Sequence, residues 1–171
     1  MIHIRQILTP DPSSLRDLCH LLQDAVHGGA SVGFLAPLGD DTAVHYWQPV
    51  FDHLSDGRCL WVAESDGQII GSVQLELCGK ENGRHRAEVQ KLLVHSAFRG
   101  RGVGTLLMRT VEAFAKADGR TLLVLDTQAG SVAETVYRHL GWQPAGLIPD
   151  YATTPTGVRH ATVYFYKQLA A

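Results

Sequence analysis

The stretch that decides the fold is Leu92-Leu93-Val94-His95, a short turn, and then Arg99-Gly100-Arg101-Gly102-Val103-Gly104, which leads directly into a helical pattern. Glycines allow positive φ angles and let backbone N–H groups approach an anion without interference from a Cβ atom. The start of the helix adds unsatisfied N–H groups and the positive end of the helix dipole. The segment therefore predicts a turn that binds a pyrophosphate group, with a tight turn that binds nothing as the alternative.

The spacing of the glycines excludes two other anion-binding motifs. A P-loop ends in Gly-Lys-Ser/Thr, whereas Gly104 is followed by Thr105 and Leu106. A Rossmann fingerprint needs G-x-G-x-x-G inside a βαβ unit. Gly100, Gly102 and Gly104 lack that spacing, and the strand before them is predicted to belong to an antiparallel series.

Beyond this turn the chain alternates between helical and extended patterns. Apolar residues at helical spacing stop at Gly119, a usual residue just past a helix end. The run 121–125 is continuously apolar, which is typical of a strand covered on both faces. Ser131 opens a capping box that begins another helix. Two strands are predicted to close the chain, at 142–147 and 161–169.

Before the turn, the pattern predicts antiparallel strands. Residues 59–64 and 68–77 flank Asp66-Gly67, which is a strong hairpin signal, and 87–95 returns as a third strand. The remaining predicted elements are an edge strand at 2–7, a helix capped by Ser13 or Ser14, and a second helix at 41–54.

These elements predict an α/β (α+β) fold with a mixed, mostly antiparallel central sheet of about seven strands and helices on both faces. The chain has 171 residues, of which 45% are hydrophobic. A chain of this size buries enough surface for one substantial core. We therefore expect a single domain over residues 1–171.

Composition excludes several classes of protein. The 15 Lys and Arg residues against 17 Asp and Glu residues give a net charge of −2, which disfavours a dedicated nucleic-acid binder. Cys19, Cys59 and Cys78 are widely spaced, so neither a disulfide framework nor a metal site is predicted. No apolar run approaches the ~18 residues of a membrane span, and we expect a cytoplasmic protein without a membrane partner.

Two motifs resemble those of a known family. Arg99-x-x-Gly102-x-Gly104 after an apolar strand resembles the acyl-CoA signature of the GNAT N-acetyltransferases. Ala133-x-x-x-Tyr137, ending in Leu140-Gly141-Trp142, resembles their second hallmark, a helix with a tyrosine followed by Leu-Gly-aromatic. The order of elements also agrees over most of the chain. The resemblance implies a GNAT-like fold and an enzyme that moves an acetyl group from acetyl-CoA to an amine without a metal.

The resemblance also implies where acetyl-CoA binds. The backbone of Leu92, Leu93 and Val94 would pair with the pantetheine amides, and an N–H freed by a bulge near Leu93 would meet the acetyl carbonyl. Many family members have Asn seven residues before the tyrosine, where this chain has Gly130 followed by Ser131, a helix cap and candidate contact with CoA. The pyrophosphate would be bound by Arg99, Gly100, Arg101, Gly102, Val103, Gly104 and Thr105.

Acetylation of an amine requires a neutral amine, stabilisation of the developing oxyanion and a proton for the departing thiolate. Glu88 stands where several family members carry a catalytic glutamate, and Asp126 ends the next strand. In the family these strands splay apart, so both carboxylates would face the acceptor and either could be the base. Anchoring the acceptor is the alternative role, and it is favoured for Asp126. Tyr137 is the candidate acid, with core packing as its alternative.

Several segments more closely resemble the tabtoxin-resistance group of this family, namely 27–34, 87–92, 125–127, 129–134 and parts of 152–160. This resemblance favours a small-molecule amine as acceptor, with a β-lactam-type toxin as one candidate. A protein N-terminal or lysine acetyltransferase and a non-catalytic acyl-CoA sensor are the alternatives, and the resemblance also admits a homodimer. The implied acceptor contacts are His27, Gly28, Ser31, Phe34, Trp47 and Tyr151, with core packing as the alternative for Trp47.

Overall fold

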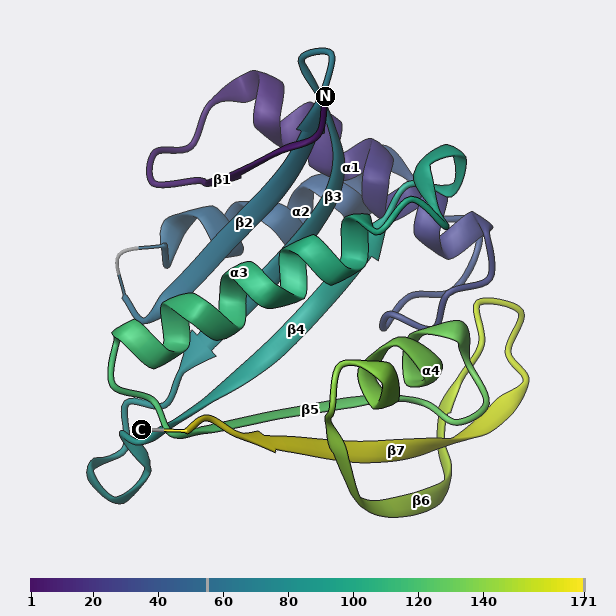
Figure 1. The fold of residues 1–171 in the computed structure, drawn as a ribbon. Helices are drawn as coiled ribbons and strands as arrows, with labels where there is room; N and C mark the ends of the chain where they lie inside the picture. The colour runs from purple at the N-terminus through teal and green to yellow at the C-terminus, as the bar shows by residue number, and fades with distance from the viewer. Residues whose placement is uncertain (55, 171) are drawn as a thin grey trace.

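The computed structural model describes residues 1–54 and 56–170, which form one seven-stranded sheet with helices on both sides (Figure 1). The order of elements predicted from the sequence is confirmed. The elements are β1 (His3–Gln6), α1 (Pro12–His27), α2 (Asp40–Asp52), β2 (Arg58–Ser65), β3 (Gln68–Leu77), β4 (Arg86–Val94), α3 (Val103–Ala117), β5 (Leu122–Gln128), α4 (Val132–His139), β6 (Gln143–Thr153) and β7 (Arg159–Gln168).

The strands lie in the order β1-β2-β3-β4-β5-β7-β6. Every neighbouring pair in the described chain is antiparallel except β4 and β5, which are parallel. The mixed, mostly antiparallel sheet is therefore confirmed. The parallel pairing is short, because it runs only from Arg86↔Leu122 to Glu88↔Val124.

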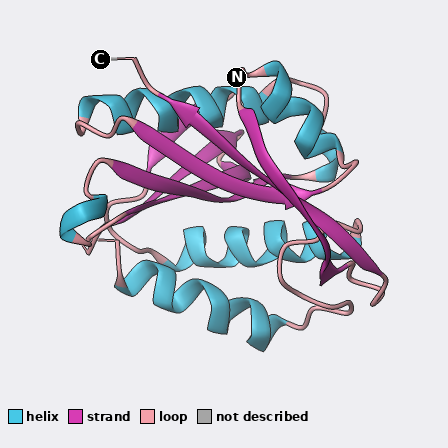
Figure 2. Cartoon of the chain, turned by 90° about the horizontal axis from the view of Figure 1, so that it is seen from below, coloured by secondary structure: helices cyan, strands magenta, loops and turns pink. Residues whose placement is uncertain are grey.

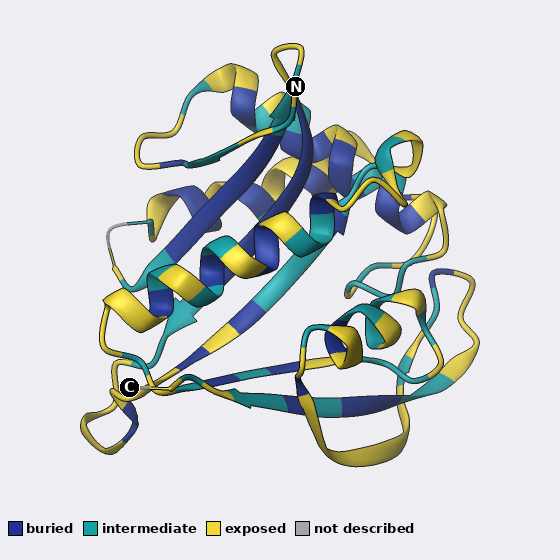
Figure 3. Ribbon diagram, viewed as in Figure 1, coloured by how far each residue is buried: buried dark blue, intermediate teal, exposed yellow. Residues whose placement is uncertain are grey.

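Helices cover the two faces of the sheet as separate layers (Figure 2). The helices α3 and α4 pack on one face, where Val73, Leu107 and Phe165 belong to the same buried cluster. The helices α1 and α2 pack on the other face around Leu22, Trp47 and other apolar side chains. Strands β2 and β3 are buried between the layers, whereas the edge strand β6 is exposed along nearly its whole length (Figure 3). Among the described helices, none has the length and apolar character needed to cross a membrane.

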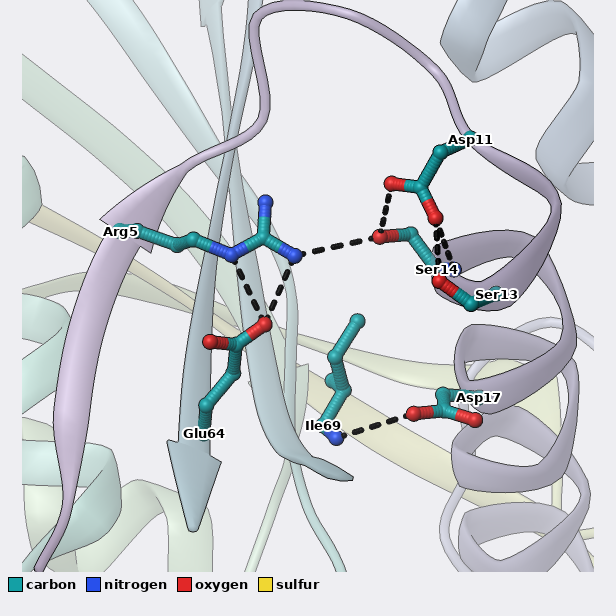
Figure 4. A network of polar contacts seen from close by, with 7 residues as sticks. All are labelled: Arg5, Asp11, Ser13, Ser14, Asp17, Glu64 and Ile69. Carbon is teal, nitrogen blue, oxygen red and sulfur yellow. Dashed lines mark hydrogen bonds and ion pairs between the residues drawn. The ribbon is translucent and has the colours of Figure 1, made fainter. Parts of the chain in front are cut away.

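The start of α1 differs from the prediction, because Asp11 rather than Ser13 or Ser14 is the N-cap (Figure 4). Its Oδ1 accepts a hydrogen bond from the Ser14 backbone N–H at 2.8 Å. Pro12 occupies the first helical turn, where its missing N–H costs nothing. The two serines already lie inside the first turn of the helix, and their hydroxyls donate to Asp11.

The same region holds α1 against the edge of the sheet. The Arg5 guanidinium on β1 lies 2.7 Å from Glu64 on β2 and also donates to the Ser14 hydroxyl at 3.2 Å (Figure 4). The Asp17 carboxylate accepts a hydrogen bond from the backbone N–H of Ile69 at 3.3 Å. These contacts fix the helix relative to three strands.

Strand β6 is longer than the predicted 142–147, because it continues to Thr153. Its pairing with β7 shifts register between Pro144 and Gly146 and again between Ile148 and Ala152. Proline is tolerated at bulges and on edge strands, where its missing N–H breaks no ladder. Pro144 and Pro149 are therefore accommodated within the strand.

Candidate active site

A β-bulge interrupts β4 where the resemblance implied one. Ser72 pairs with Leu93 and Gln74 pairs with Gln90, so two residues of β4, Lys91 and Leu92, lie opposite one residue of β3. Lys91 adopts a left-handed conformation with φ 49°. A bulge leaves a backbone group outside the ladder and changes the face on which the following side chains lie.

The two parallel strands diverge immediately after Glu88. From there β5 continues in register with β7 as far as Gln128↔Thr162, while β4 remains paired with β3. The β5 side of residues 89–94 therefore has no partner strand in the described chain. Its free backbone groups are available to an extended ligand with amide groups, in the manner of an added strand.

The start of α3 lies beside the end of this free edge. A Cβ atom on Gly104 would lie 3.7 Å from the Val94 side chain. The first N–H groups of an α-helix have no partner within the helix, and among the described residues no side chain caps those of α3. The N-cap Gly102 has φ 78°, and a Cβ atom there would meet nothing within 4 Å. This open helix start suits the phosphates of acetyl-CoA, while the β4 edge suits its pantetheine arm.

The two arginines of the turn are turned toward the protein. Arg99 Nε donates to the Val94 carbonyl oxygen at 3.1 Å, and its guanidinium lies 4.0 Å from Asp24 on α1. The Arg101 guanidinium lies over the Phe98 ring, 5.1 Å from its centroid. In this conformation their side chains brace the turn.

Glu88 and Asp126 are exposed side chains on the same face of the sheet, on either side of the divergence. The Thr162 hydroxyl shares its proton between Asp126 Oδ2 at 2.9 Å and the Thr127 carbonyl oxygen at 2.8 Å. Tyr164, opposite Asp126 on β7, has its hydroxyl 2.7 Å from that of Tyr151. This hydrogen bond, with lesser contributions from burial and from the charges of Asp126 and Glu88, raises the pKa of Tyr164 to about 12.

Tyr137 of α4 is buried, with its ring centroid 6.1 Å from that of Trp142 and 6.2 Å from that of Phe165. Burial raises the pKa of Tyr137 well above its usual range, and the charge of Asp126 raises it further. The phenol is therefore protonated throughout the neutral range. Ser131 caps this helix, since its hydroxyl accepts a hydrogen bond from the Glu134 N–H at 3.2 Å.

The predicted acceptor contacts fall into separate places. Ser31 Oγ lies 2.7 Å from His160 Nε2, and the Phe34 ring packs edge-on against Tyr46 at 5.4 Å, so the loop between α1 and α2 meets the β6–β7 hairpin. Tyr151 also lies at this hairpin. By contrast, Trp47 is fully buried in the core.

His27 and Gly28 lie at the end of α1, near the phosphate side of the site. His27 Nε2 accepts a hydrogen bond from the Leu38 N–H at 3.0 Å, which fixes the loop. A Cβ atom on Gly28 would lie 3.5 Å from the Arg99 guanidinium. The contacts of these two residues are thus with Leu38 and the Arg99 turn, whereas Ser31 contacts the β6–β7 hairpin.

Sequence reasoning did not single out Tyr46, Lys91 or Tyr164. Both strands were predicted, but the pairing of β5 with β7, which puts Tyr164 opposite Asp126, was not. Tyr46 precedes a core residue in a helix, and nothing in the local pattern separates it from its neighbours. The face on which Lys91 lies depends on the bulge, because the bulge interrupts the alternation of side chains along β4 at that residue.

Comparisons with known proteins agree with this geometry. The model of the acetyltransferase (GNAT) family matches residues 15–142. N-acetyltransferase 8 of Rattus norvegicus is 42% identical over 99 residues, which cover 55% of this chain and 44% of that protein. Overall, the chain spans about half or less of the length of the first curated relatives that it matches.

Solved structures share the fold. An N-acetyltransferase from Staphylococcus aureus Mu50 has a TM-score of 0.82 at 17% identity, with 99% of each chain covered. YncA from Salmonella typhimurium, solved with acetyl-CoA as its cofactor, has a TM-score of 0.80 at 18% identity, covering all of this chain and 95% of the other. The predicted GNAT-like fold is confirmed.

Proposed function

Because this chain belongs to the acetyltransferase (GNAT) family, we propose that it transfers the acetyl group of acetyl-CoA directly to a primary amine of a small molecule. The observation that carries the proposal is the divergence of β4 and β5 after Glu88↔Val124. It leaves a free backbone edge beside an uncapped helix start and sets Glu88 and Asp126 on one face. A donor site and an acidic acceptor site therefore adjoin one another.

In this proposal the backbone of Leu92–Val94 binds the pantetheine arm, and the first N–H groups of α3 bind the pyrophosphate. Acetyl-CoA supplies the activated acetyl group. A backbone N–H at the bulge donates to the acetyl oxygen as negative charge develops there, a type of stabilisation that often contributes most to catalysis. The bulge is held in place by the packing of β4 on β3.

Glu88 takes the proton of the amine, directly or through water, and Asp126 holds the ammonium form before that step. The assignment rests on contacts, since Asp126 is already bound by the Thr162 hydroxyl whereas Glu88 has no such partner in the described chain. Within the described chain both oxygens of Glu88 are free to accept a proton, whereas one oxygen of Asp126 already accepts a hydrogen bond.

Tyr137 protonates the departing thiolate. Burial makes this phenol a weaker acid than usual. A thiolate released beside it is desolvated by the same surroundings and becomes a stronger base. The pKa values of the phenol and of the thiol are therefore raised together, so the proton is still transferred between groups of similar basicity.

The loop between α1 and α2 supports a small acceptor. The Ala36 N–H donates to the Pro155 carbonyl oxygen at 2.9 Å, and Ser31 contacts Thr153 and His160. These contacts close one side of the acceptor face, whereas an extended peptide needs an open path. The segments that resemble the tabtoxin-resistance group make a β-lactam-type toxin one candidate acceptor.

The test is acetyl-CoA-dependent thiol release across the tabtoxin warhead, other amino-acid-like antibiotics, polyamines and peptides. Saturable turnover on small amines supports the proposal, and turnover on the warhead identifies the toxin. Turnover on peptides alone moves the protein to the protein-acetylating class. Binding of CoA with no turnover on any acceptor favours a sensor and contradicts the proposal.

A further inference from the structure

Lys91 lies on the acceptor face of the sheet, and none of the described carboxylates pairs with it. Its left-handed backbone at the β4 bulge sets its Nζ over the Tyr46 ring of α2, 5.4 Å from the centroid. From the other side, a Cβ atom on Gly33 would lie 3.8 Å from the same Nζ. The ammonium group is thus enclosed by a strand, a helix and a loop.

No ion pair between residues of the described chain includes Lys91. The other cation nearby, Arg58, lies 2.7 Å from Glu76 and is therefore neutralised. Lys91 feels the charges of Asp126 and Glu88 without contacting either. Of the two cations, Lys91 is therefore the one without an anionic partner at contact distance among the described residues.

This arrangement has an energetic consequence. Desolvation lowers the pKa of Lys91, although the charges of Asp126 and Glu88 act in the opposite direction. A half-buried ammonium loses hydration, and an anion in contact with it restores that loss. An anionic ligand group is the partner that Lys91 lacks.

Resting on the proposed function, we propose that Lys91 binds a carboxylate of the acceptor while Glu88 and Asp126 bind its amine, so that the acceptors are zwitterionic, amino-acid-like molecules. A cation and two carboxylates on one face complement one anionic and one cationic group. A polyamine or an alkylamine offers only the cationic group and would leave Lys91 desolvated. A neutral peptide segment next to the reacting amine would also leave Lys91 desolvated.

The test compares free amino acids with their carboxamides, which keep the amine and nearly the same shape but lose the negative charge. Steady-state KM and kcat are measured for both sets with the unchanged protein, Lys91→Met and Lys91→Arg. Lys116→Met, which removes an exposed lysine at the far end of α3, is the matched control. Thermal unfolding and acetyl-CoA binding confirm that each variant is folded.

We expect the unchanged protein to favour the free acids. Lys91→Met should raise KM for the free acids by about tenfold to a hundredfold, the usual worth of a hydrogen bond to a charged group. For the carboxamides, Lys91→Met should raise KM far less. Lys91→Arg should keep part of the preference for free acids over carboxamides, and Lys116→Met should keep all of it. Equal losses for acids and carboxamides, or no preference in the unchanged protein, would overturn the proposal.

A binding measurement separates this proposal from the transferase activity. With lysine labelled at Cε, the NMR signal of Lys91 is assigned by its absence in Lys91→Met, and free amino acids or carboxamides are then added. A shift with the acids alone supports the anion site even if no acceptor is acetylated, in which case the proposed activity is what fails. No shift with any free acid overturns the inference, including when other amines are acetylated.

Discussion

Glu88 and Asp126 lie on the same face of the sheet, on neighbouring parallel strands whose pairing ends at Glu88 itself. The position of the last paired residue matters. Glu88 lies at the point of divergence, and Asp126 lies on β5, two residues beyond the last paired residue of that strand. The two carboxylates therefore adjoin the free edge of β4, where the acetyl donor is proposed to bind.

Replacing Glu88 by Gln should remove the base while leaving the backbone edge intact. We expect unchanged acetyl-CoA affinity and a kcat that falls by ~10²–10⁴-fold near neutral pH, the usual contribution of a positioned acid–base group. The loss should shrink at alkaline pH, where the amine is already neutral. Stopped assays of thiol release across pH check this. Glu81→Gln, at an exposed turn, is the control, and an unaltered kcat in Glu88→Gln would remove Glu88 from this role.

Replacing Asp126 by Asn should affect binding of the acceptor more than chemistry. The amide oxygen can still accept from the Thr162 hydroxyl, so the local structure is retained. We expect the acceptor KM to rise by about tenfold with a much smaller change in kcat, the pattern of a lost binding contact. If kcat falls as far as in Glu88→Gln, the two carboxylates share the role of base.

Tyr137→Phe should separate proton donation from packing. The phenyl ring keeps its contacts with Trp142 and Phe165, so thermal unfolding should be nearly unchanged. We expect kcat to fall by about 10²-fold, the lower end of acid–base contributions. Because burial raises the pKa of Tyr137, kcat should show no alkaline decline from its ionisation up to pH ~10. A decline near pH 9 that disappears in Tyr137→Phe would contradict this.

Gly102 and Gly119 provide a matched pair at the two ends of α3, with φ 78° and 79°. Alanine in the left-handed region costs ~1–2 kcal/mol, so both substitutions should lower stability similarly. Only Gly102→Ala places a methyl group at the proposed phosphate site, and we expect it alone to weaken acetyl-CoA binding by about tenfold, ~1.4 kcal/mol. Calorimetric titration measures this, and equal affinities in the two variants would argue against phosphate binding at this turn.

Asp11 should give acid-dependent stability. Hydrogen bonds from Ser13 and Ser14 lower the pKa of Asp11 to about 2. A lowered pKa stabilises the folded state above the unfolded value, ~3.9, and this contribution is lost as pH falls through about 2. Asp11→Ala should reduce the free energy of unfolding by ~1 kcal/mol at pH 7.

The control for this prediction is Asp11→Asn, which keeps an acceptor for the Ser14 N–H but does not titrate. Thermal unfolding between pH 7 and 2 should show the unchanged protein losing stability relative to Asp11→Asn only below pH ~4. If stability falls equally with pH in the two proteins over that range, ionisation of Asp11 does not cause the loss of stability in acid.

The sequence alone determined the order of the helices and strands and the residues at which several of them end. These signals are local: Asp66-Gly67 forms the predicted tight turn, with both residues at positive φ, and Gly119 follows the end of α3 as predicted. Spacing within one turn or one strand fixes such features, because the interacting atoms are only a few residues apart. The error at the start of α1 was also local, because Asp11, two to three residues before the predicted serines, is the N-cap.

The tertiary structure decided which of these groups meet. The family resemblance implied that the strands of Glu88 and Asp126 splay apart, but the last paired residue follows from β5 pairing with β7 rather than further with β4. The burial of Trp47 and the partial burial of Lys91 depend on packing between segments far apart in the chain. Composition and spacing cannot supply that information, because a one-residue bulge in β4 changes which side chains face the acceptor.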